Sequence, residues 1–352
     1  MFYREAGQFN TSYQADGQIF PIRQDRYAFC ALLLLAFCVV PACASAYALT
    51  ALLIPFLILS LAALGLNILT GYAGQLSLGS AAFMAVGAFA SYNFVARVPG
   101  MPMLLAFVLG GLCAAAVGIV FGLPSLRIRG FYLAAATLAT QFFVLWCMTK
   151  IPYLSNGSAS GVITAQQIII LGYAFATPAS KYLLVLAVVA LMALAAKNMV
   201  RSNVGRSWMA LRDMDLAAEV IGIRPLRTKL LAFAVSSFYC GVAGALYAYA
   251  YLGTVEPDAY NLDLSLHILF MIIIGGVGSV LGSFLGAAFV VLLPVGLNML
   301  THALALPTSV ASNLELMLFG ALIMFFLIAE PHGLARLWQT TKEKLRLWPF
   351  PH

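Results

Sequence analysis

Residues 51–70 read ALLIPFLILSLAALGLNILT, a run of 20 positions without a charged side chain. A helix of about 20 mostly apolar residues is long enough to cross the hydrocarbon core of a bilayer. The whole chain shares this composition, since 63% of its 352 residues are hydrophobic and only 9% are charged. Soluble domains carry roughly 25% charged residues, so lipid is the expected solvent. The sequence therefore predicts an all-α, polytopic bundle of transmembrane helices.

About ten apolar runs of this kind follow one another with short gaps. They cover residues 28–47, 51–70, 81–96, 101–123, 131–148, 182–196, 230–252, 265–281, 283–300 and 314–329. A further apolar run at 161–177 is interrupted by Gln166, Gln167 and Gly172, and we place it outside the membrane as a surface or re-entrant segment. The first run ends in small residues, as a signal peptide does, but a long polar tail with acidic residues precedes it. We interpret it as a retained helix.

The chain carries a net charge of +7, and its basic residues lie between the apolar runs, where they set topology. Nucleic acid is therefore not an expected partner. With ten spans and a cytoplasmic N-terminus, only Arg97, Lys150 and Lys181 fall in outer segments, and the rest of the 19 basic residues fall in inner ones. Such an excess of Lys and Arg on the inner side directs insertion. The sequence predicts a multi-pass protein of the bacterial inner membrane with both termini in the cytoplasm.

The predicted spans divide the chain into a cytoplasmic N-terminal tail at 1–27, a membrane domain at 28–335 and a cytoplasmic C-terminal tail at 336–352. Two connecting loops within the membrane domain are long. The loop at 149–181 is rich in Ser, Gly and Thr, and we expect it in the periplasm. The loop at 197–229 is rich in basic residues, and we expect it in the cytoplasm.

The cytoplasmic loop contains a short amphipathic pattern. Apolar residues recur every three or four positions, at Trp208, Leu211, Met214, Ala218 and Ile221. This spacing predicts one helix with an apolar stripe. Gly222 suits the position just past its end, and Pro225 prevents the helix from resuming. The helix could lie on the lipid headgroups, or it could be a docking element for a cytoplasmic partner.

Glycines and polar side chains interrupt the apolar sequence at residues 71–80, which read GYAGQLSLGS. Non-helical backbone at membrane depth must be buried in protein or line a cavity. Transporters place substrate paths at such breaks, although a cytoplasmic turn between two spans would look similar. On the first interpretation, the residues that border a translocation path are Asn67, Gly71, Gly74, Gln75, Ser77 and Ser80.

Two sets of small residues lie inside the predicted spans. Gly278, Gly282 and Gly286 are spaced by four residues, and this spacing predicts a small-residue face for close helix packing. None of the six cysteines forms a CxxC pair. We interpret the cysteines as small buried hydrophobic residues rather than metal ligands or disulfide partners.

Several motifs of other protein classes are missing. No predicted span carries Lys, Arg, Asp or Glu near its centre, as ion-coupled carriers usually do. The chain has no G-x-x-x-x-G-K-[ST] phosphate loop and no HExxH or GxSxG motif. We expect no enzymatic activity, metal or cofactor in this chain. A secondary carrier of small hydrophobic solutes and a lipid-modifying membrane enzyme are alternatives, and these absences weigh against both.

Five stretches, in order, resemble the permeases of branched-chain amino-acid ABC importers, specifically the LIV-type M subunit. They are LTGYAGQLSLG at 69–79, GLPSLRIRGFYL at 122–133, the cytoplasmic segment 205–223 followed by Lys229, GGVGS at 275–279 and EPHGL at 330–334. The resemblance implies that two homologous permeases form the pore. Two cytoplasmic ATPases, which bind ATP and Mg, would drive it, and a periplasmic binding protein would deliver the substrate.

In this family the cytoplasmic helix would couple the permease to the ATPases. The resemblance assigns that contact to Arg206, Arg212, Asp213, Asp215, Ala217, Ala218, Glu219 and Gly222. Branched-chain or related amino acids are the expected cargo. Related importers carry urea, short amides or aromatic acids, and these substrates stay open at this point.

Overall fold

The computed structural model describes residues 12, 23–125, 131–158, 160–170, 172–303, 317–318, 320–321, 324–325, 328 and 333–347. Most of these residues are helical, which confirms the predicted helical bundle, and the strands among them are two residues long. The helices are α2 (Arg23–Leu34), α3 (Val40–Cys43), α4 (Ile54–Asn67), α5 (Ser80–Arg97), α6 (Met103–Ser125), α7 (Phe131–Lys150), α8 (Pro178–Arg201), α9 (Asn203–Asp213), α10 (Asp215–Val220), α11 (Pro225–Leu246), α12 (Leu262–Gly275), α13 (Val280–Ala303) and α15 (Gly333–Leu347). Wider π-helical turns are η1 (Leu35–Val39), η2 (Ala48–Leu53), η3 (Ile68–Tyr72) and η4 (Tyr247–Leu252), and η5 (Pro257–Tyr260) is a 3-10 turn.

Among the described residues, eight helical stretches are long and apolar enough to cross a membrane. They are Arg26–Cys43, Ala48–Tyr72, Met103–Leu123, Tyr132–Lys150, Pro178–Arg201, Pro225–Leu252, Pro257–Gly275 and Val280–Leu297. The predicted run at 81–96 forms α5, which is not among the eight. Most of α5 is buried by neighbouring helices, so small and polar residues replace strongly apolar ones there. The predicted run at 314–329 lies mostly outside the described residues.

The centre of the bundle consists of α4, α5, α6 and α11, and α11 packs most extensively on α6 and α5. Glycines bring these backbones together. A β-carbon on Gly87 of α5 would lie 2.1 Å from the carbonyl oxygen of Gly241 on α11, and one on Gly244 would lie 2.0 Å from that of Met84. Small residues allow such close approach between helices in a membrane, where no hydrophobic force drives helix association.

Large apolar side chains cover the outside of the bundle, where a bilayer would be their solvent. Phe142 and Trp146 on α7 are examples of such exposed residues. All six cysteines are free, but Cys30, Cys38 and Cys43 are exposed. Cys113 and Cys147 are only partly buried, so the prediction that the cysteines are buried is confirmed for Cys240 alone. A lipid-facing position suits a small hydrophobic side chain as well as a protein core does.

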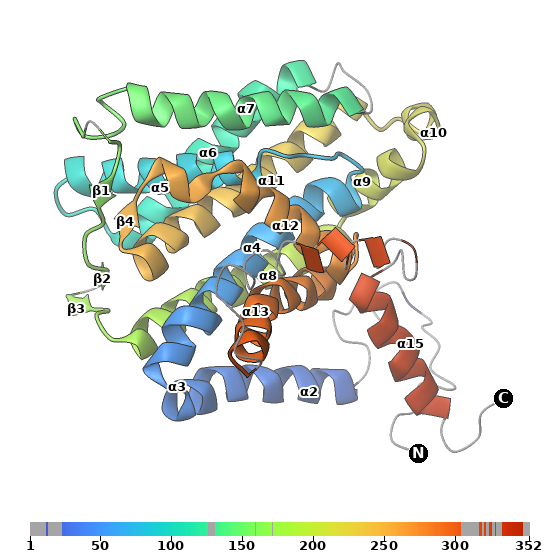
Figure 1. Ribbon diagram of the computed structural model, residues 1–352. Helices are drawn as coiled ribbons and strands as arrows, with labels where there is room; N and C mark the ends of the chain where they lie inside the picture. Colours follow the sequence, from blue (N-terminus) through green and yellow to red (C-terminus); the bar gives the residue numbers. More distant parts are fainter. Residues whose placement is uncertain are drawn as a thin grey trace.

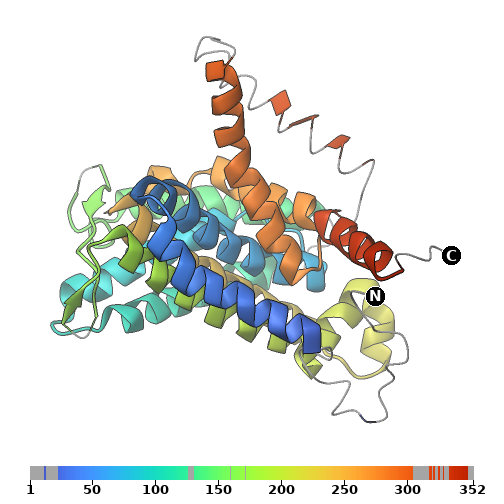
Figure 2. The ribbon, with the colours of Figure 1, turned by 90° about the horizontal axis from the view of Figure 1, so that it is seen from below.

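The two ends of the bundle carry different structures (Figure 1). At one end, β1 (Ile163–Thr164) pairs antiparallel with β4 (Thr254–Val255), and β2 (Ile169–Ile170) pairs with β3 (Tyr173–Ala174). At the opposite end lie α9, α10 and α15, together with the start of α2. Figure 2 shows the same separation from below, with α13 leaning away from the other helices. The described residues of the segment 161–177 lie outside the helices.

The connection between α12 and α13 differs from the prediction. The predicted span 265–281 ends at Gly275, because Gly276 and Gly278 have φ angles of 120° and 80° and form a turn. Gly278 therefore lies outside the helical stripe that the sequence predicts. Gly286 lies on α13 against α12, where a β-carbon would come within 1.7 Å of the Met271 carbonyl oxygen. The helix α15 occupies most of the predicted C-terminal tail at 336–352.

Candidate functional site

The break at residues 71–80 begins where α4 widens into the π-helical turn η3. An extensive set of hydrogen bonds from Asn67 holds this end of α4. Its Nδ2 donates to the Ser279 carbonyl oxygen at 2.8 Å and to Ser283 Oγ at 2.9 Å, and its Oδ1 accepts from the Gly278 backbone N–H at 2.8 Å. Asn67 therefore clamps the α12–α13 turn onto α4, rather than facing an open path.

Gly71 lies directly beside this clamp. A β-carbon there would lie 2.1 Å from Asn67 Oδ1 and 2.3 Å from the Gly278 nitrogen, so no larger residue fits without a shift of the backbone. Gly71 is buried. Close packing therefore explains why a glycine stands at this position. Asn67 and Gly71, both expected to border a path, belong to the same contact between the end of α4 and the α12–α13 turn.

The break ends where α5 begins inside the protein, and side chains of other helices satisfy its first N–H groups. Thr137 Oγ1 accepts from the Leu78 N–H at 2.9 Å, and Gln141 Oε1 accepts from the Ala82 N–H at 2.7 Å. Ser265 Oγ accepts from the N–H of residue 81 at 2.9 Å. The first N–H groups of any helix lack partners within the helix, so these contacts fix where α5 starts.

Sequence reasoning missed these three side chains, of which Gln141 and Ser265 accept from N–H groups of α5 itself and Thr137 accepts from a residue just before it. Gln141 gives the clearest signal, because it is an amide in a predicted span that is otherwise mostly apolar. Of the two serines expected at the path, Ser77 accepts from the Gly79 N–H at 3.3 Å. Ser80 Oγ is buried without a hydrogen-bond partner.

The segment at 203–220 forms two helices, α9 and α10, instead of the single helix that the sequence predicts. Met214 is extended between them, with φ −158° and ψ 102°. The predicted apolar stripe is therefore divided. Trp208 and Leu211 on α9 and Ala218 on α10 are buried, whereas Met214 and Ile221 are exposed. The bend at Met214 turns the outer apolar residues away from the bundle.

Both ends of this segment are fixed. Trp208 Nε1 donates to the Thr228 carbonyl oxygen at 3.0 Å and so anchors α9 to α11. At the other end Gly222 has φ +89°, its N–H donates to the Glu219 carbonyl oxygen, and the Ile223 N–H donates to that of Ala218, each at 3.0 Å. These bonds form a Schellman motif. The predicted helix end at Gly222 is confirmed.

The break and the segment of α9 and α10, which the sequence treats as separate features, are in contact. Arg212 Nη1 on α9 donates to the Gly71 carbonyl oxygen at 3.0 Å. A β-carbon on Gly74, which has φ +69°, would lie 2.9 Å from Arg212 Cγ. Arg212 also forms an ion pair with Asp213 at 2.9 Å. A displacement of α9 would therefore reach the end of α4 directly.

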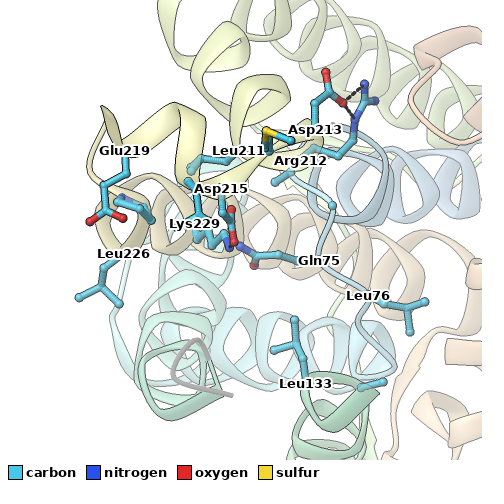
Figure 3. A pocket seen from close by; sticks show the side chains of 16 residues that line it. Gln75, Leu76, Leu133, Leu211, Arg212, Asp213, Asp215, Glu219, Leu226 and Lys229 are labelled. Carbon is cyan, nitrogen blue, oxygen red and sulfur yellow. Dashed lines mark hydrogen bonds and ion pairs between the residues drawn. The ribbon is translucent and has the colours of Figure 1, made fainter. Parts of the chain in front are cut away.

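A cavity of about 750 Å³ lies between the break and the helices α9 and α10 (Figure 3). It is lined by Ala73, Gly74, Gln75, Leu76, Leu133, Ala134, Leu211, Arg212, Asp213, Met214, Asp215, Leu216, Glu219, Pro225, Leu226 and Lys229. Lys229 Nζ donates to Asp215 Oδ2 at 2.6 Å, and the Gln75 side chain points toward this pair. Sequence reasoning noted Lys229 only as part of a motif. Charged groups and leucine side chains thus share one cavity.

Only some of the expected path residues and expected coupling residues line the cavity. Gly74 and Gln75 line it from the break, and Arg212, Asp213, Asp215 and Glu219 line it from α9 and α10. The other expected path residues are buried in the packed interior. The remaining expected coupling residues are Arg206, which bonds to Asn203 on its own helix, the exposed Ala217 and Gly222, and the buried Ala218.

Comparison with known proteins shows the family of the chain. Residues 48–327 match the family described as "Branched-chain amino acid transport system / permease component". The chain belongs to this family. The resemblance inferred from the five sequence stretches is thereby confirmed. As a member, the chain is a multi-pass permease subunit of the bacterial inner membrane.

Individual relatives agree with this assignment. The chain is 29% identical over 311 residues to the high-affinity branched-chain amino acid transport system permease protein LivM of Escherichia coli (strain K12), covering 81% of this chain and 68% of that protein. The same values hold for LivM of Salmonella typhimurium. The probable branched-chain amino acid transport permease protein LivM of Methanocaldococcus jannaschii is 26% identical over 243 residues, which cover 66% of this chain and 68% of that protein. No solved structure gives a significant match.

Proposed function

We propose that this permease forms half of the translocation pathway of an ATP-driven importer for branched-chain or related amino acids. The contact of Arg212 with Gly71 and Gly74 carries the proposal, because it joins the cytoplasmic helices to a break in the membrane helices. Transporters use such breaks for substrate passage. The names of the bacterial relatives support amino acids as the cargo.

The outer surface of α10 suits the docking of a cytoplasmic ATPase. Its exposed side chains include Leu216 and Val220, of which Val220 is 88% exposed, and Ile221 follows them. Apolar side chains that gather on a surface outside the membrane mark an interaction site. Charged Asp213 and Glu219 beside them would select the partner by electrostatic complementarity.

The complete importer would contain a second homologous permease, two cytoplasmic ATPases and a periplasmic binding protein. ATP and Mg would bind to the ATPases, since this chain has no phosphate loop. Within the permease, we propose ten spans with both termini in the cytoplasm. On this topology the tails at 1–27 and 336–352 and the loop at 197–229 are cytoplasmic, and the loop at 149–181 is periplasmic.

Reconstitution tests this function. Proteoliposomes that contain both permeases and both ATPases, with ATP inside and binding protein outside, should accumulate radiolabelled leucine. Vesicles with this chain alone should show neither uptake nor ATP hydrolysis, and vesicles of the full complex without ATP serve as the matched control. Proton-driven leucine uptake by the chain alone would contradict the proposal.

A further inference from the structure

Polar groups at the cavity have hydrogen-bonding capacity that the protein does not use. The Gln75 side chain is only 3% exposed, yet neither its Nε2 nor its Oε1 has a hydrogen-bond partner. Asp215 Oδ1 is also buried without a partner, while Oδ2 of the same carboxylate accepts from Lys229. A lysine ammonium group has three N–H donors, so the bond to Asp215 leaves two. Because buried unpaired polar groups destabilise a protein, this arrangement indicates a bound partner.

The unused groups match a zwitterion. Gln75 Nε2 and Lys229 Nζ offer donors to a carboxylate, and Gln75 Oε1 and Asp215 Oδ1 offer acceptors to an ammonium group. The ligand can bind without breaking the ion pair between Asp215 and Lys229. Because this pair has no net charge, it favours a dipolar ligand over a simple anion or cation.

Besides the charged Arg212, Asp213 and Glu219, the rest of the wall is apolar. Leucine side chains from four segments, Leu76, Leu133, Leu211 and Leu226, line the cavity. Its volume of about 750 Å³ falls within the range of about 300–1,000 Å³ typical of small-molecule sites, which are mostly apolar with a few placed polar groups. Such a wall suits an aliphatic side chain.

We propose that this cavity is a cytoplasmic-side binding site for a zwitterionic α-amino acid with an apolar side chain, the released cargo itself. The proposal rests on the proposed function for the orientation and the cargo. A bound amino acid connects Gln75 of the break with Asp215 of α10 and Lys229 of α11. It stabilises the present arrangement of break and coupling helices, and therefore slows further import when the amino acid accumulates in the cytoplasm.

The test measures the initial uptake of labelled leucine by the reconstituted complex after the vesicle lumen has been loaded with unlabelled compounds. Lumenal leucine should slow uptake at least fivefold relative to an empty lumen. Leucinamide, which lacks the carboxylate, and 4-methylpentanoate, which lacks the ammonium group, should each slow it less than twofold.

Variants locate the effect, with each variant normalised to its own empty-lumen rate. Gln75→Leu and Lys229→Met should lose the inhibition, whereas Gln167→Leu, at an exposed site near the strands, should keep it. Equilibrium binding of labelled leucine to the purified permease gives the same comparison for a variant that transports poorly. There the affinity should fall at least tenfold in Gln75→Leu and stay unchanged in Gln167→Leu. Gln75→Leu should melt no lower than wild type, because it removes no hydrogen bond of the protein.

The outcomes separate this inference from the function on which it rests. Normal uptake that is indifferent to lumenal leucine overturns the inference alone, as does equal inhibition or equal binding in wild type and Gln75→Leu. Equal inhibition by leucine and by its two analogues also overturns it. No ATP-dependent uptake into an empty lumen overturns the proposed function, and this inference with it.

Discussion

At the scale of single residues, the amide of Asn67 joins segments that lie more than 200 positions apart. It uses both of its polar atoms, on the backbone of the α12–α13 turn and on Ser283. The side chain is fully buried, so protein groups must supply the hydrogen bonds that water would otherwise make with its amide. The neighbouring Gly71 leaves the space that this arrangement needs. The two residues therefore fix the geometry of the break.

Replacing Gly71 by alanine tests this joint. In Gly71→Ala the new methyl group meets Asn67 Oδ1 at 2.1 Å and the Gly278 nitrogen at 2.3 Å. Overpacking of this kind destabilises by about 1–3 kcal/mol, so the melting temperature of the purified permease should fall. Gly296→Ala is the matched control, since no atom lies within 4 Å of its new methyl group and alanine favours a helix. Equal melting temperatures for the two variants would contradict the role of Gly71.

Sequence reasoning found these residues but not their partners. Asn67 and Gly71 stood out because an amide and a glycine interrupt apolar sequence, and such interruptions have functional and structural causes alike. The distinguishing fact is the contact with Gly278 and Ser283, which only the folded chain shows. Gln75 was recognised by the same signal, and it lines the cavity.

At the scale of elements, the short helices α9 and α10 connect α8 to α11. Periodicity grouped Trp208, Leu211 and Ala218, which are buried, with Met214 and Ile221, which are exposed, because a repeat of three or four residues cannot show a bend. The extended backbone of Met214 places Ala218 inward and Ile221 outward, although both belong to the same predicted stripe. The glycine at the helix end was predictable, because a left-handed backbone favours a residue without a β-carbon.

A substitution at Gly222 tests the proposed role of α10 in coupling to the ATPases. Gly222→Val places a β-branched residue at φ +89°, a conformation that costs L-residues about 1–2 kcal/mol, and it should displace the end of α10. Substrate-stimulated ATP hydrolysis by the assembled complex should fall severalfold, while the permease still reaches the membrane. Gly100→Val is the matched control, since Gly100 has φ +77° in equally open space within the turn between α5 and α6. Equal coupling in the two variants would show that α10 is only a connector.

At the scale of the whole molecule, hydropathy predicted α5 as an apolar run at 81–96 but could not show that protein rather than lipid surrounds it. Its helix is enclosed by α6, α11 and other helices, so its composition reflects protein contacts rather than lipid. The same limit applies to the turn at Gly276–Ser279, where continuous apolar sequence hides a change of direction. Charge, in contrast, carried information about the two ends of the bundle. The basic segment around α9 and the strands near Ile163 lie at opposite ends.

The orientation of these ends is the last testable consequence. Alkaline phosphatase, a reporter that needs disulfides and so folds only in the periplasm, should be active when fused after Ser158, a few residues before β1 in the sequence. Fused after Asp213, at the end of α9, it should be silent, because the excess of basic residues keeps that end in the cytoplasm. A fusion after Leu347, the last residue of α15, should also be silent, since α15 lies at the same end as α9. Immunoblots for equal expression provide the control. An active fusion after Asp213 with a silent one after Ser158 would reverse the orientation and place the cavity beside Gln75 on the periplasmic side, where it could not sense released cargo.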